Sequence, residues 1–209
     1  MCYNLGMERL ASLTIDDFLD RLGSKKPVPG GGGAAGVSGA VGAALALMVV
    51  SYSIGRKNLA EHQDVLDAID IELQDLRARM MHLADEDASA YAELSALWGL
   101  PKSDPKRVEG WDLALDRAIA VPTGIMDAGA RLLDLCARLA PICNTLLLSD
   151  LAGAAALAEA CVRVAGQNVR VNAVMLGNAN ATERLLADLE HRRTRASQMR
   201  AEIEKVCGS

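Results

Sequence analysis

The stretch 27–55 constrains this chain most, because it runs for 29 residues without a charge. It opens with P-V-P-G-G-G-G and is closed by Arg56 and Lys57. Proline disrupts a helix interior and pushes the preceding residue toward extended backbone, so a helix can begin only within the glycines. We expect it to start near Gly32 and to end at about Ile54. Two stripes keep helical spacing: the small residues Gly32, Gly36, Gly39, Ala43, Ala46 and Val50, and the residues Ala34, Val37, Val41, Leu45, Met48 and Tyr52.

A helix that is apolar on every side is either a membrane span or the centre of a helical protein. This stretch is long enough to cross a bilayer. Its apolar residues are mostly alanine and glycine, however, and the free energy of membrane insertion comes mainly from larger side chains. We therefore expect a buried central helix and no membrane partner.

Composition indicates how the rest of the core is filled. The 209 residues are 51% hydrophobic but include only one Phe, three Tyr and two Trp. A core of Ala, Leu, Val and Met suits closely packed helices. The sequence thus predicts an all-α fold, a single domain over 1–209 with a bundle of about five to seven helices.

Charge, cysteines and histidines exclude several function classes. A net charge of -5 disfavours nucleic acid as a partner, since phosphates require a basic footprint. The cysteines contain no C-x-x-C pair and the N-terminus has no signal-peptide pattern, which predicts reduced thiols in the cytoplasm. The three histidines are too scattered to suggest a metal site. The cysteines are Cys2, Cys136, Cys143, Cys161 and Cys207.

The remaining helices follow from caps and breaks. Thr14 predicts the cap of a short helix that ends at Leu22. Residues 61–98 form a long amphipathic pattern that ends before Pro101. Pro105 then begins a helix in which Pro122 predicts a kink or break. Two more helices are expected, a small-residue helix over about 149–176 and a charged cover helix over about 182–206.

Asp87 is the anomaly within this pattern. It occupies a heptad position otherwise filled by Leu66, Leu73, Met80 and Leu94. A lone carboxylate on a packing seam costs desolvation energy unless it is paired or faces a cavity, which favours a functional site. Tyr91, one turn later, could bond to it or line the same pocket.

Other polar residues have two readings each. The glycines 30–33 can present free amides to an anion, or they can simply allow close packing. They lack the lysine and the strand of nucleotide-binding loops, so we do not expect a nucleotide. Arg56 and Lys57 can bind a ligand carboxylate or complement a helix dipole. Asp150 beside Ser149 can serve catalysis or cap a helix.

Asn168 and Asn172 can orient a polar ligand or bond neighbouring helices. Asp150 and Asn168 are 18 residues apart, about 27 Å along one helix. If both serve one site, the ligand is elongated, the helix is interrupted, or a second subunit contributes one of them. This separation favours a groove at a subunit interface.

A series of motifs then resembles a known family. They are T-I-D-D-F-L-D-R-L, P-V-P-G-G-G-G-A-A, S-I-G-R-K, D-A-S-A-Y, L-P-K, S-D-L-A-G-A-A-A-L-A-E-A and N-V-R-V-N. Their order over about 14–174 resembles the cyclodeaminase/cyclohydrolase family, which includes the C-terminal domain of formiminotransferase-cyclodeaminase and the stand-alone methenyltetrahydrofolate cyclohydrolases. The resemblance implies an all-helical homodimer that binds tetrahydrofolate derivatives near subunit contacts, without a metal or redox cofactor.

The resemblance also implies which residues form the site. The expected catalytic residues are Asp87 first and Asp150 second. The expected substrate-binding residues are Gly30, Gly31, Gly32, Gly33, Gly55, Arg56, Lys57, Tyr91, Asn144, Ser149, Asn168 and Asn172. The chain departs from the family pattern around Cys143 to Leu146, where G-N-x-N is usual, at Asn58 and Leu59, and at Ser51, Tyr52 and Ser53.

The implied chemistry suits these residues. The one-carbon bridge of methenyltetrahydrofolate is an amidinium cation open to attack by water, and a buried carboxylate can stabilise it and accept a proton. No formiminotransferase domain accompanies the sequence, so we expect hydrolysis of 5,10-methenyltetrahydrofolate to 10-formyltetrahydrofolate. The alternatives are a formiminotetrahydrofolate cyclodeaminase and a noncatalytic folate-binding homodimer.

Overall fold

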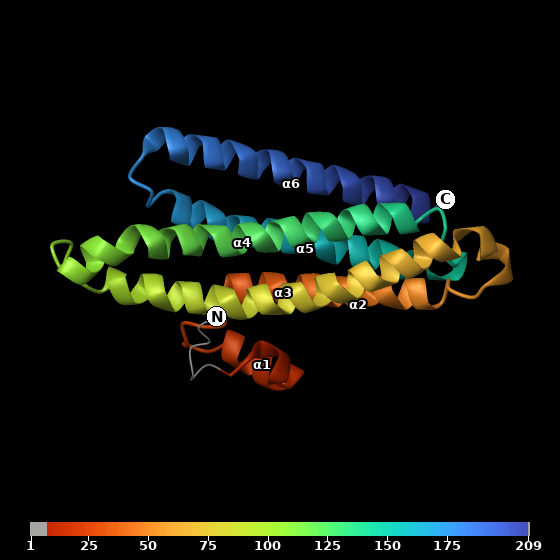
Figure 1. Ribbon diagram of the computed structural model, residues 1–209, viewed down its shortest axis with the longest axis horizontal. Coiled ribbons are helices and arrows are strands. Elements are labelled where there is room, and N and C mark those ends of the chain that lie inside the picture. The colour runs from red at the N-terminus through yellow and green to blue at the C-terminus, as the bar shows by residue number, and fades with distance from the viewer. Residues whose placement is uncertain (1–7, 209) are drawn as a thin grey trace.

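The computed structural model describes residues 8–208, and within them the chain forms six α-helices and three 3-10 helices (Figure 1). The α-helices are α1 (Ile15–Leu22), α2 (Gly31–Ser51), α3 (Gln63–Trp98), α4 (Pro105–Leu139), α5 (Leu148–Ala173) and α6 (Ala179–Cys207). The 3-10 helices are η1 (Leu10–Ser12), η2 (Lys57–His62) and η3 (Thr145–Leu147). The predicted all-α fold is confirmed.

Four helices form an antiparallel ring in the order α2, α3, α4, α5, and each packs on the next. Between α2 and α3, for example, Gly32 meets Asp87 and Gly39 meets Met80, so the two helices run in opposite directions. The predicted seam of α3 is buried, and each fully buried Leu or Met contributes about 2 kcal/mol. α6 covers α4 and α5, as its charged outer face predicts.

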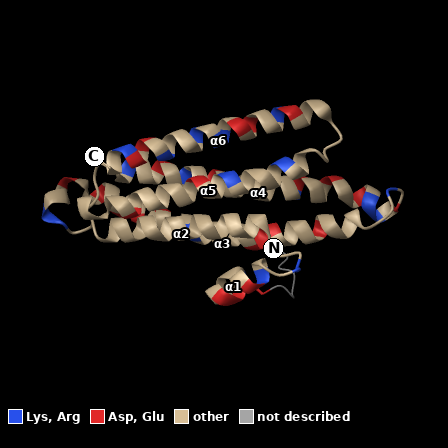
Figure 2. Ribbon diagram, turned by 180° about the vertical axis from the view of Figure 1, so that it is seen from behind, with Lys and Arg blue, Asp and Glu red and all other residues tan. Residues whose placement is uncertain are grey.

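Helix α2 is buried on one side only. All of its predicted small-residue stripe is buried, and a Cβ on Gly36 would lie 2.7 Å from the Ala84 Cβ, so only glycine allows this approach to α3. The other stripe is partly exposed, with Val41 53% exposed. In the single chain the expected buried central helix is thus buried only on the side that faces its neighbouring helices. Figure 2 shows no charged residue along this helix.

The cap at Thr14 and the start of α4 at Pro105 match the sequence predictions, but one predicted feature differs. The Thr14 side chain accepts a hydrogen bond from the Asp17 amide. The side chain of Asp104, just before Pro105, caps α4. α4 continues through Pro122 without a break. The cover helix and the small-residue helix begin and end within a few residues of their predicted bounds.

Two segments, Gly31–Ser51 and Thr145–Ala173, are long and apolar enough to cross a membrane by length and composition alone. In the structure they belong to neighbouring helices of the ring, and both are partly buried. The four cysteines among residues 8–208 are free thiols, while Cys2 lies outside the described residues. The preference for a bundle helix over a membrane span thus agrees with the packing, and the absence of a membrane partner stays a prediction.

Candidate functional site

Asp87 lies against the first turn of α2. A Cβ built on Gly32 would be 2.1 Å from the Asp87 Cγ and 2.2 Å from each carboxylate oxygen, so the carboxylate fills the space of the absent side chain. The first intrahelical hydrogen bond of α2 runs from the Ala34 amide to the Gly30 carbonyl, at 2.9 Å. The amides of the three residues between them therefore lie free at the positive end of the helix dipole.

Burial dominates the electrostatics of Asp87. Desolvation raises the pKa of its carboxyl from 3.8 to about 6. Among residues 8–208, no cation or hydrogen-bond donor is paired with this carboxylate, and no hydrogen bond joins it to Tyr91. Tyr91 is 49% exposed one turn further along α3. A carboxyl with a pKa near neutrality can exchange a proton under physiological conditions.

Asn168 of α5 reaches the same helix end from the other side. A Cβ on Gly31 would lie 3.1 Å from the Asn168 Oδ1 and 3.3 Å from its Nδ2. The Nδ2 atom is buried and has no hydrogen-bond partner among the described residues. An unpaired buried donor costs free energy, and such a cost is often associated with a missing ligand. We call Gly31, Gly32, Asp87 and Asn168 the glycine-end cluster.

A second group of predicted residues lies at the opposite end of α2. The buried Ser53 hydroxyl donates to the Val49 carbonyl at 2.7 Å and accepts from the Asn144 amide at 2.8 Å. Asn144 in turn caps η3 through its side-chain oxygen. Arg56 and Lys57 lie a few residues after Ser53 and are exposed, and Ser149 is exposed as well. We call Arg56, Lys57, Asn144, Ser149 and Asp150 the arginine-end cluster.

The two clusters are separated within one chain. The 21 residues of α2 span about 30 Å. The structure thus brings Asp87 together with the glycines and Asn168, and it places Asp150 at the far end of the bundle. Asp150 lies in the first turn of α5 but provides no side-chain cap, so the capping explanation for it is wrong.

Asn172 has a structural partner. Its Nδ2 donates to the Ala118 carbonyl of α4 at 2.7 Å. Ala118 is four residues before Pro122, so this carbonyl is the one that the proline leaves without a backbone donor. The Asn172 amide supplies the missing hydrogen bond and explains why α4 does not break there. This contact is the structural alternative that the sequence left open for Asn172.

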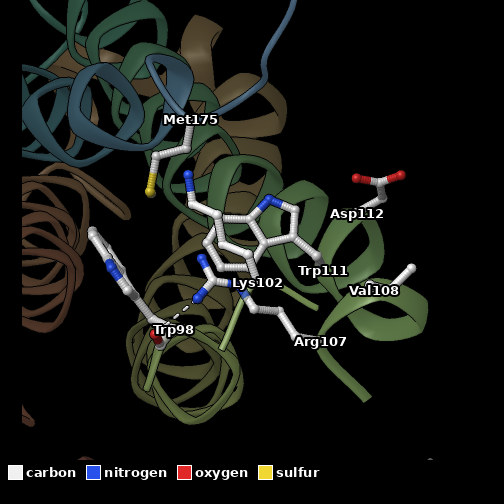
Figure 3. Close-up of a pocket in the computed structure, with 7 residues that line it drawn as sticks. All are labelled: Trp98, Lys102, Arg107, Val108, Trp111, Asp112 and Met175. Atoms are coloured by element: carbon white, nitrogen blue, oxygen red, sulfur yellow. Dashed lines mark hydrogen bonds between the residues drawn. The ribbon is translucent and has the colours of Figure 1, made fainter. Parts of the chain in front are cut away.

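Sequence reasoning missed one cavity of about 490 Å³, which lies at the turn between α3 and α4. Its lining includes Trp98, Lys102, Arg107, Trp111 and Met175, and we call these five residues the tryptophan pocket (Figure 3). Trp98 and Trp111 are the only two tryptophans of the sequence, and they flank the L-P-K motif. This placement of the two tryptophans is the sequence signal that could have identified the pocket.

Comparisons with known proteins agree on one family. Residues 14–191 match the family described as formiminotransferase-cyclodeaminase. A methenyltetrahydrofolate cyclohydrolase from Methylorubrum extorquens is 35% identical over 181 residues, which covers 85% of this chain and 87% of that protein. The formimidoyltransferase-cyclodeaminase of Rattus norvegicus is 30% identical over 169 residues, and this match spans 31% of its length.

A solved structure agrees with the fold. The crystal structure of formiminotetrahydrofolate cyclodeaminase from Thermotoga maritima superposes with a TM-score of 0.86 at 25% identity. The match covers 95% of this chain and 97% of that one.

Proposed function

Because the chain belongs to the formiminotransferase-cyclodeaminase family, we propose that it hydrolyses 5,10-methenyltetrahydrofolate to 10-formyltetrahydrofolate. The observation that carries this proposal is the 35% identity to the cyclohydrolase of Methylorubrum extorquens over most of both chains. The cyclodeaminase relatives match over about a third of their length, so the activities of those whole proteins are weaker guides.

In this proposal Asp87 acts on the attacking water. Water adds to the bridging carbon of the amidinium and the carboxylate accepts one of its protons. Asp87 then returns this proton to N5 as the bond from the carbon to N5 breaks. The hydroxyl of the adduct becomes the formyl carbonyl, and its proton is released to solvent. The pKa of Asp87, near 6, leaves the carboxylate ionised at pH 7 and able to stabilise the cationic substrate.

The neighbours of Asp87 would position the substrate. The free amides at the start of α2 are donors for carbonyl groups of the pterin. The unpaired Asn168 Nδ2 is a further donor at the same place. No step of this reaction requires a metal or redox cofactor. The absence of a cofactor and the cytoplasmic location stay predictions.

We further propose that the protein is a homodimer. The exposed stripe of α2 and the adjacent face of α5 form one uncharged surface, which is unusually apolar for a free helix pair. Its residues are Ala34, Val37, Val41, Ala44, Leu45 and Met48 of α2 and Ala152, Gly153, Ala156, Leu157, Ala160 and Val164 of α5.

A two-fold dimer would also explain the separated clusters. If α2 packs antiparallel on its copy, the glycine-end cluster of one protomer approaches the arginine-end cluster of the other. Asp87 and the cations Arg56 and Lys57 would then serve one substrate from two chains.

A second activity is favoured by one observation, the high structural similarity to the Thermotoga maritima cyclodeaminase. The name of that enzyme gives formiminotetrahydrofolate as its substrate. Closure of the formimino group onto the ring with loss of ammonia would need the same donors around the one-carbon unit.

The decisive experiment gives the purified protein each folate in turn. Loss of methenyltetrahydrofolate absorbance above the spontaneous rate supports the hydrolase. Formation of that absorbance from formiminotetrahydrofolate, with ammonia release, would identify the cyclodeaminase. Tight binding of both without turnover would leave a noncatalytic folate-binding protein.

A further inference from the structure

The tryptophan pocket lies on the same helix faces as the glycine-end cluster. Ala84 of α3 packs on Gly36 of α2, and the positions seven and fourteen residues later are Tyr91 and Trp98. On α5, Asn168 packs on Gly31, and Met175 lies in the turn that follows the helix. Because a heptad repeats one face of a helix, Tyr91 and Trp98 face the space beyond the start of α2. Met175 lines the pocket from the end of α5.

The distance between the two places follows from helical rise. Trp98, the last residue of α3, is about 16 Å beyond Asp87. Figure 1 shows α3 and α4 projecting past the N-terminal end of α2. An elongated ligand with its reacting group at Asp87 could therefore extend along this face into the pocket.

The pocket combines aromatic surface with positive charge. The two indole rings meet edge to face, with centroids 6.4 Å apart at 81°. The Arg107 guanidinium lies 4.6 Å from the centroid of the Trp111 ring. Figure 3 shows this guanidinium between the two indoles and the Asp112 carboxylate directed away from them. The volume of about 490 Å³ is in the range of small-molecule sites.

The two cations differ in what they already bind. Arg107 donates through Nη1 to the carbonyls of Trp98, at 3.1 Å, and Leu100, at 2.6 Å, so it also closes the end of α3. No hydrogen bond or ion pair among residues 8–208 engages the Lys102 ammonium. Lys102 is thus the cation available to a ligand.

We propose that the tryptophan pocket binds the p-aminobenzoylglutamate tail of the folate. The tail's aromatic ring would stack on the indoles, and its carboxylates would pair with Lys102. This rests on the proposed function, since it takes the substrate from it. The tail is also the part of a folate that extends away from the reacting carbon, as the separation of pocket and Asp87 requires.

The test compares methenyltetrahydrofolate with methenyltetrahydropteroate, which lacks the glutamate. In the wild type, removal of the glutamate should raise KM by about tenfold, the effect of one lost charge-assisted contact, with kcat unchanged. Lys102→Gln should raise KM for the glutamylated substrate to a similar extent and leave KM for the pteroate unchanged. A merely structural role of Lys102 would alter both substrates alike.

Lys106→Gln is the matched control, because it removes the same charge from an exposed residue that does not line the pocket. It should behave like the wild type with both compounds. Equal KM values with and without the glutamate, or an equal effect of the two lysine variants on KM, would refute binding of the tail in the tryptophan pocket. Either result would leave the proposed activity intact.

Tryptophan fluorescence tests the pocket without turnover. Both tryptophans of the chain lie in it, so intrinsic emission reports its occupancy directly. A γ-linked glutamate peptide, which does not absorb at the excitation wavelength, should change the emission in a saturable manner in the wild type and Lys106→Gln but not in Lys102→Gln. Such binding in a protein inactive with either folate would refute the activity and retain the pocket. An unchanged emission at the highest peptide concentration would count against ligand binding in the tryptophan pocket.

Discussion

The carboxylate of Asp87 occupies the volume that a side chain on residue 32 would fill, with its Cγ 2.1 Å from the position of a Gly32 Cβ. The glycine therefore does more than let two helices approach. It leaves room for a charged group at the positive end of α2, next to amides that no backbone carbonyl uses.

Gly32→Ala should displace the Asp87 carboxylate, because no real Cβ tolerates a contact of this length. We expect kcat to fall by at least about a hundredfold, as for other displaced catalytic groups, with a lower melting temperature. Gly124→Ala is the control, since its Cβ would meet only the Leu83 side chain, at 3.4 Å from Cδ2 and 3.8 Å from Cδ1. Steady-state kinetics and thermal unfolding measure both. Normal kcat in Gly32→Ala would show that the position of Asp87 is unimportant.

Asp87→Asn should nearly abolish turnover while the helical circular dichroism stays unchanged. In the wild type, kcat/KM should rise with pH through an apparent pKa near 6, because only the ionised carboxylate of the free enzyme accepts a proton. The pH profile of kcat/KM checks this. Full activity in the asparagine variant would remove Asp87 from the mechanism.

The same substitution should stabilise the protein at high pH. Below about pH 3 the carboxyl is protonated in both folded and unfolded chains. Between about pH 3 and pH 6 the unfolded chain loses its proton first, so folding becomes less favourable as pH rises. Above about pH 6 the penalty for about two pKa units is about 3 kcal/mol. Denaturant unfolding should therefore show Asp87→Asn more stable than wild type at about pH 8 and equal to it at about pH 3; the opposite order would show that burial does not penalise the charge.

The two asparagines of α5 should respond differently to alanine. Asn168→Ala removes a donor that has no protein partner, so stability should stay within about 1 kcal/mol of wild type while KM rises about tenfold. Asn172→Ala removes the bond to the Ala118 carbonyl and should lose about 1–3 kcal/mol with little change in KM. Thermal unfolding and substrate titration separate the two. Equal behaviour would mean that Asn168 is structural as well.

Val41→Glu tests the dimer. Val41 lies in the middle of the uncharged surface of α2 and is 53% exposed. A buried glutamate without a partner is costly, so this variant should dissociate to monomers and lose activity. Ile71→Glu places the same charge at a 64% exposed position of α3, opposite its packing seam, and should leave the dimer intact. Analytical ultracentrifugation decides, and a monomeric wild type would end the proposal.

Local sequence signals predicted most of the fold. The cap at Thr14 and the helix start at Pro105 depend on a few adjacent residues, and the seam of α3 depends on a repeat within one helix. The small-residue stripe of α2 likewise lies on the buried side. The exposed side of α2 was not predicted, because hydropathy records that a face is apolar and not which molecule covers it.

The site was predictable only in part. Asp87 could be singled out because it breaks a local pattern, but its contact with Gly32 joins residues 55 positions apart and no local signal specifies it. The separation of Asp87 from Asp150 follows from the antiparallel packing of α2 and α5. Ser53 was noted only as a departure from a family motif, whereas its buried hydroxyl ties the end of α2 to the turn before α5.

The hydrogen bond from Asn172 to the Ala118 carbonyl makes the helical position of Pro122 depend on a side chain of α5. A proline in the middle of a 35-residue helix is tolerated here through an amide contributed by a different helix. The two residues therefore depend on each other. Loss of Asn172 leaves the Ala118 carbonyl without a hydrogen-bond donor. Replacement of Pro122 adds a backbone amide that competes with the Asn172 side chain for this carbonyl. An asparagine that a motif comparison assigns to ligand binding can in this way be retained for the sake of a distant proline.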